Sequence, residues 1–179
     1  MDKRIARLIQ LMSRYDRGDI PRINHFLKVH NLAAAIGMME KIDDNQQLIL
    51  EAAAVLHDIG IHISEQKYGR CDGYLQEKEG PDEAMPVLDK CGGFTPQQTE
   101  RICYLIAHHH TYTEIQDIDY QILVEADFLV NFYEDRLSAQ AIENVRQKVF
   151  KTSTGKRLLE DMYMASYKKP MQAALQEKA

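Results

Sequence analysis

Residues 48–60 read LILEAAAVLHDIG, and this stretch decides the fold. Its apolar residues follow helical spacing rather than the strict alternation of a strand, and Gly60 supplies a helix stop. We expect a helix that Asp44 caps at its N-terminus and that continues to Gly60. Gln47 follows Asp44 by three residues and would close a capping box.

The segments on both sides also carry apolar residues at helical spacing, so the sequence predicts an all-α fold, a single-domain helical bundle. Thr95 is expected to cap a later helix that ends in the histidines 108–110, with Gln98 closing a capping box. The remaining helices are expected over residues 2–16, 21–41, 119–133, 138–150 and 154–175.

Residues 61–80 mix glycine, charge and tyrosine without a clean period. We interpret this segment as an excursion, partly loop, between two helices, and we expect the next helix to start at Pro81. Loops of this length often line functional sites.

The composition fits one domain over residues 1–179, because 45% hydrophobic residues can bury a sizeable core at this length. The 22 basic and 27 acidic residues give a net charge of −5, which argues against a polynucleotide partner. Three cysteines without a CxxC pair indicate neither a disulfide framework nor a cysteine-rich zinc site. No apolar run reaches the length of a signal or membrane segment, so we expect a cytoplasmic protein without a membrane partner.

The strongest chemical signal is the pair His57 and Asp58 at the end of the apolar helix. Burying such a pair carries a desolvation penalty. A divalent cation would offset this penalty by coordination, since imidazole nitrogen and carboxylate oxygen are both good ligands. Taken alone, an adjacent His and Asp are usually ordinary polar residues. The interpretation therefore depends on partners elsewhere in the chain.

Candidate partners lie in two other predicted helices. Asp127 shares the inward side of its helix with Leu123 and Val130, although a buried acid paired with lysine or arginine would look the same. His25 and His30 each follow an apolar stripe, and periodicity does not choose between them.

The order of these motifs resembles the HD superfamily of metal-dependent phosphohydrolases over about residues 20–135, with further helices over 138–175. The resemblance is carried by H-x-x-x-V-x-x-x-A from His25, A-x-x-L-H-D-I-G around His57 and Asp58, and a later A-D at Asp127. It implies that these four residues hold one divalent cation (Mn, Fe, Mg, Ni, Co or Zn) and that His30 stays outside the site.

The resemblance also bears on a second cation, because two-metal branches place further histidines near EGPDEA at 79–84 and IAHHH at 106–110. Glu79 stands where those branches often have histidine, and an oxygen ligand would favour Mn, Fe or Mg. His109 faces inward by its spacing from Ile106 and is the best further ligand, with His110 next. His108 is better read as a helix C-terminal residue.

The segment after His57 and Asp58 carries cations and aromatic rings that could hold phosphate oxygens and stack on a base. The candidate substrate-binding residues are His62, Lys67, Arg70 and Lys78, with Tyr68 and Tyr74 beside them. Solvated surface is the alternative for most of them. The chain lacks the GYP motif of the cyclic-dinucleotide branch, so we do not transfer that substrate.

The resemblance implies a metal-dependent phosphohydrolase, a phosphomonoesterase or phosphodiesterase, acting on a small phosphorylated metabolite or nucleotide. In such a mechanism Asp58 orients a water, Glu79 serves as the base if it is not a ligand, and His109 or His110 protonates the leaving oxygen. Two other functions are compatible with the motifs: a catalytically silent nucleotide-sensing module and a diiron oxygenase of the HD type.

Overall fold

The computed structural model describes residues 1–164, in which helices are joined by turns and loops and no strand occurs, so the all-α prediction is confirmed. The predicted helix over 154–175 lies partly outside the described residues. The helices are α1 (Lys3–Tyr15), α2 (Ile20–Glu40), α3 (Asp44–Leu56), α4 (Gly60–Tyr68), α5 (Gly73–Cys91), α6 (Pro96–Ile106), α7 (Ile118–Glu134), α8 (Ala139–Lys148), α9 (Ser153–Leu159) and the π-helical turn η1 (Glu160–Met164).

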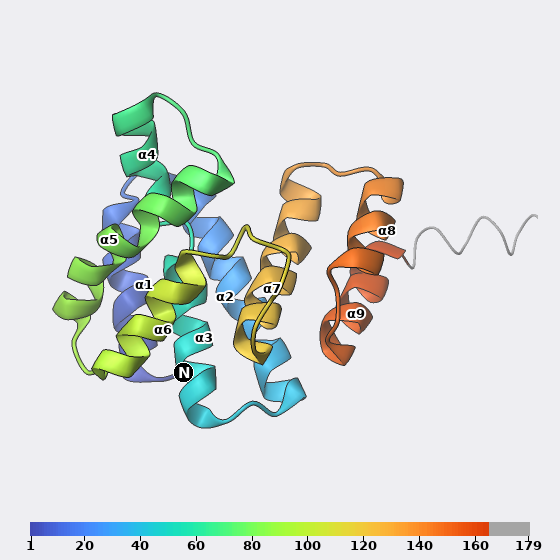
Figure 1. Ribbon diagram of the computed structural model, residues 1–179, viewed down its shortest axis with the longest axis horizontal. Helices are drawn as coiled ribbons and strands as arrows, with labels where there is room; N and C mark the ends of the chain where they lie inside the picture. The colour runs from blue at the N-terminus through green and yellow to red at the C-terminus, as the bar shows by residue number, and fades with distance from the viewer. Residues whose placement is uncertain (165–179) are drawn as a thin grey trace, which may run out of the picture.

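The central helix is α3, which contacts α1, α2, α6 and α7 and is therefore surrounded by other helices (Figure 1). This burial explains why the stretch around Leu50 and Leu56 is apolar on all sides. In Figure 1 helices α1, α5 and α6 lie on one side of α2 and α3, whereas α8 and α9 lie on the other side beyond α7.

Both ends of α3 differ from the prediction. Asp43, and not Asp44, is the N-cap, because its side chain accepts from the Gln46 amide at 2.8 Å. Gln47 closes no capping box, since its side-chain amide donates instead to Ala34 O and Glu51 Oε1. The helix ends at Leu56, so residues 57–59 form a turn into α4.

The predicted excursion over residues 61–80 is wrong, because α4 and the first part of α5 occupy most of it. Helix α5 begins before Pro81 and passes through it, although an interior proline costs about 3 kcal/mol. Close packing offsets this cost: a Cβ on Gly60 would lie 2.6 Å from Gln76 O, and a Cβ on Gly80 would lie 2.6 Å from Ile106 Cγ2. Two glycines thus bring α4, α5 and α6 together. Asp72 also caps the start of α5 by accepting from the Leu75 amide at 3.1 Å, so a local signal and tertiary packing both support a helix through this segment.

Two further helices bear on the site. The capping box of Thr95 and Gln98 is confirmed at the start of α6, but α6 ends at Ile106, so the three histidines lie in the turn after the helix. Within residues 1–164 no helix combines the length and apolar character needed to cross a bilayer.

Candidate metal centre

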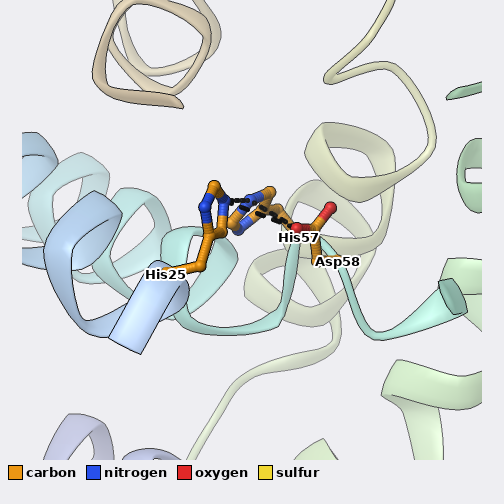
Figure 2. A group of neighbouring side chains, drawn as sticks. All are labelled: His25, His57 and Asp58. Atoms are coloured by element: carbon orange, nitrogen blue, oxygen red, sulfur yellow. Dashed lines mark hydrogen bonds and ion pairs between the residues drawn. The ribbon is translucent and has the colours of Figure 1, made fainter. Parts of the chain in front are cut away.

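Three elements bring the four predicted ligands together. His25 comes from the first half of α2, His57 and Asp58 from the turn after α3, and Asp127 from α7. His25 Nε2 lies 3.2 Å from both His57 Nε2 and Asp127 Oδ1 and 3.4 Å from Asp58 Oδ2. Figure 2 shows the two imidazole rings and the Asp58 carboxylate turned toward one another.

These separations match the spacing of ligands around one cation. His57 Nε2 lies 3.4 Å from Asp58 Oδ2 and 3.5 Å from Asp127 Oδ1. Neighbouring ligands at about 2.1 Å from one cation lie about 3 Å or more from one another. The ligand atoms of His25, His57 and Asp58 all lie within 4.8 Å of one another, and Asp127 joins them through its contacts with the two histidines.

The hydrogen bond made by Nδ1 in His25 and in His57 identifies Nε2 as the nitrogen of each ring that is free to bind a metal. His57 Nδ1 lies 2.9 Å from Ala54 O, and His25 Nδ1 lies 2.7 Å from Glu134 Oε2. Both of these partners accept, so each Nδ1 must carry the proton and each neutral ring presents a bare Nε2 lone pair. Two such lone pairs facing the carboxylates of buried Asp127 and partly buried Asp58 leave a site without a donor, which a cation or extra protons must fill.

The pKa values of His25 and Asp127 also show that this cluster favours positive charge. Burial lowers the pKa of His25, but the hydrogen bond with Asp127 and the charge of Asp58 outweigh burial and raise it to about 9. Burial raises the pKa of Asp127, but His25 and His57 hold it well below its usual range. Without a cation, protons therefore take its place in the cluster.

A second group shares Asp58. His109 Nε2 lies 3.5 Å from Asp58 Oδ1, whereas the other carboxylate oxygen, Oδ2, faces His25 and His57. His109 is fully buried, its Nδ1 lies 2.7 Å from Ile106 O, and its Nε2 has no hydrogen-bond partner. This orphaned lone pair also fits a cation.

His110 completes the second group with Asp58 and His109, and the ligand atoms of the three lie within 4.8 Å of one another. Burial, followed by the charge of His109, lowers the pKa of His110 to about 4, so its ring is neutral near pH 7. It contacts Gln76 Oε1 at 2.9 Å and the Tyr112 hydroxyl at 3.2 Å.

Three other histidine or carboxylate candidates stay outside both groups. Glu79 lies within α5, where its carboxylate pairs with Lys67 and accepts from the Tyr68 hydroxyl at 2.7 Å. His30 contacts Glu51 Oε2 at 3.0 Å, on the α3 side of α2. His108 directs Nδ1 to Tyr104 O at 2.7 Å.

The four predicted substrate-binding residues all have polar partners of their own. Lys67 pairs with Glu79 as described, and Lys78 donates to the Tyr68 hydroxyl at 3.0 Å. Arg70 and His62 also contact carboxylates: Arg70 pairs with Asp72 at 2.8 Å, and His62 Nε2 lies 3.0 Å from Asp16 Oδ1.

Sequence reasoning missed three residues that touch the predicted ligands, namely Glu134, Gln76 and Tyr112. Glu134 follows Asp127 by seven residues, and this spacing could have identified it as a neighbour on the same helix face. Gln76 and Tyr112 carry no such signal, because they reach His110 only through the packing of α5 and the conformation of the turn after α6.

Comparisons with known proteins agree with this site and fold. The family model described as HD domain matches residues 22–144. The chain is similar to the crystal structure of a predicted HD superfamily hydrolase from an uncultured Thermotogales bacterium, with 26% identity and a TM-score of 0.64. That similarity covers 96% of this chain and 91% of the other. No curated protein matches the chain. With more than half of its length matched by the family model, the chain belongs to the HD-domain family.

Proposed function

We propose that this protein is a metal-dependent phosphohydrolase that cleaves a phosphate ester of a small phosphorylated metabolite or nucleotide. The observation that supports this most directly is the convergence of bare Nε2 lone pairs and carboxylate oxygens at 3.2–3.5 Å. Such a set is costly to bury without a cation. The similarity to a predicted HD superfamily hydrolase supports hydrolysis as the reaction class.

His25, His57, Asp58 and Asp127 are the proposed ligands of the first cation. Two imidazoles among the four favour a transition metal such as Mn, Fe, Co, Ni or Zn over Mg. A divalent cation there would supply an acidified water and a positive charge beside a phosphoryl oxygen.

The second group extends this site. Asp58 Oδ1 is proposed to orient the attacking water. Burial lowers the pKa of His109, but Asp58 outweighs burial and raises it, so His109 is proposed to donate the Nε2 proton of its imidazolium form to the leaving oxygen. A base role for Glu79 would require its carboxylate to leave Lys67 and Tyr68, so we assign no base role to Glu79. His109 and His110 could equally hold a second cation with Asp58.

The test combines metal analysis of purified protein with a panel of phosphorylated metabolites and nucleotides, read out as phosphate or alcohol release. We expect release that requires metal, is abolished by Asp58→Asn and is unaffected by Glu143→Gln on the distant helix α8. Nucleotide binding without release would support the silent sensing module. Two irons per chain, with a diiron optical or Mössbauer spectrum and oxygen consumption, would support the oxygenase.

A further inference from the structure

The imidazole of His25 lies between two carboxylates of one helix. Asp127 Oδ1 is 3.2 Å from Nε2 of the ring, and Glu134 Oε2 is 2.7 Å from Nδ1. Glu134 follows Asp127 by seven residues, about two turns, so both side chains lie on one face of α7. Helical side chains lean toward the N-terminus, which allows Glu134 to reach back toward the ring.

The other oxygen of Glu134 is also engaged. Lys28 Nζ forms an ion pair with Glu134 Oε1, and Lys28 follows His25 by three residues on α2. Residues at this spacing lie on one face of a helix. Two residues of α2 thus hold the Glu134 carboxylate: Lys28 contacts one of its oxygens, and His25 contacts the other.

Glu134 distinguishes His25 from the other two buried histidines of the centre. His57 and His109 direct Nδ1 to neutral backbone carbonyls, Ala54 O at 2.9 Å and Ile106 O at 2.7 Å. His25 alone among these three directs Nδ1 to a carboxylate. A charged acceptor makes a stronger hydrogen bond and a more basic ligand than a neutral carbonyl does.

We propose that Glu134 is a positioning residue of the metal centre: it holds the proton of His25 on Nδ1 and thereby aims the Nε2 lone pair at the cation. This inference rests on the proposed function, since it requires His25 to be a metal ligand. Glu134 itself contacts neither the cation nor the substrate and acts through His25.

The first measurement is a zinc titration against a chelating indicator in wild type, Glu134→Ala and Glu134→Gln. Loss of a carboxylate that supports a metal-bound histidine weakens metal binding by about 10–100-fold, which we expect for Glu134→Ala. Glu134→Gln should lose less, because the amide oxygen still accepts from Nδ1. The matched control is Glu143→Gln, which removes another carboxylate–cation pair, with Arg146 on α8, and should keep the wild-type affinity.

The second measurement separates positioning from a merely structural role. In zinc-loaded protein the Nδ1 proton of His25 should resonate far downfield in the NMR spectrum and move upfield in Glu134→Gln. A residue that only stabilised the fold would lower the melting temperature without moving this resonance.

Wild-type zinc affinity in Glu134→Ala, or an unmoved His25 resonance in Glu134→Gln, would overturn the inference and leave the proposed function standing. Failure of the wild type itself to bind zinc, manganese or iron would overturn both. The two failures are therefore distinguishable in the same set of titrations.

Discussion

Removal of the metal should make the stability of this protein depend on pH through His25. Burial lowers the pKa of this histidine, but Asp127 and Asp58 outweigh burial and raise it to about 9 in the metal-free fold, against about 6.5 in an unfolded chain. The folded protein therefore binds this proton more tightly than the unfolded chain does. The resulting stabilisation is complete below about pH 6.5 and is lost as the pH rises through about 9.

The difference between the two pKa values corresponds to about 3 kcal/mol of unfolding free energy. Urea denaturation in the presence of a chelator, at pH values from about 6 to about 9.5, measures it. The matched control is His25→Gln, which has no titrating ring and should lose far less stability across this range. A metal-free wild type whose unfolding free energy stays constant over this pH range would refute the reasoning. So would a His25→Gln variant whose unfolding free energy falls as steeply as that of wild type. Saturating metal should remove the dependence on His25 over the same range, because a bound cation replaces the proton.

The other predictions concern the ligands and the fold. Asp58→Ala should lose bound metal and phosphatase activity but keep its circular dichroism spectrum, and wild-type metal content in the variant would contradict this. Titration of manganese into metal-free protein distinguishes the two roles of His109: one equivalent in wild type supports the acid role, whereas two equivalents in wild type and in Glu79→Ala but one in His110→Ala would assign His109 and His110 to a second cation. Glu125→Ala should destabilise the fold by about 3 kcal/mol in urea denaturation, because the buried Glu125 carboxylate accepts from the amides of Lys151 and Thr152. A loss of unfolding free energy below about 1 kcal/mol would contradict this.

The sequence predicted the helices whose own periodicity and caps are strong. Thr95 and Gln98 form the expected capping box because both partners lie within one turn of the chain. The helix through Pro81 was missed although Asp72 caps its start by accepting from the Leu75 amide at 3.1 Å. The reason is that Pro81 also suits the first turn of a helix, and that the packing of α4 and α6 at Gly60 and Gly80 is not visible in the sequence.

The candidate site also combines features that the sequence predicted with contacts that depend on how the helices pack. Periodicity alone left His25 and His30 equivalent, and only the motif spacing favoured His25; the structure brings His25 to His57 and pairs His30 with Glu51. Glu79 was expected at the site from its position in a motif. Its partner Lys67 lies one helix earlier, and that pairing depends on how α4 packs against α5.

Asp58 faces His25 and His57 with one oxygen and His109 with the other. Two cations that both used the Asp58 carboxylate would not bind independently, because each would alter the charge available to the other. Linkage then requires reciprocity: the factor by which the first ion changes the affinity for the second equals the factor by which the second changes the affinity for the first. Such a centre would behave as one cooperative unit, in which the concentration of either ion governs the occupancy of both positions.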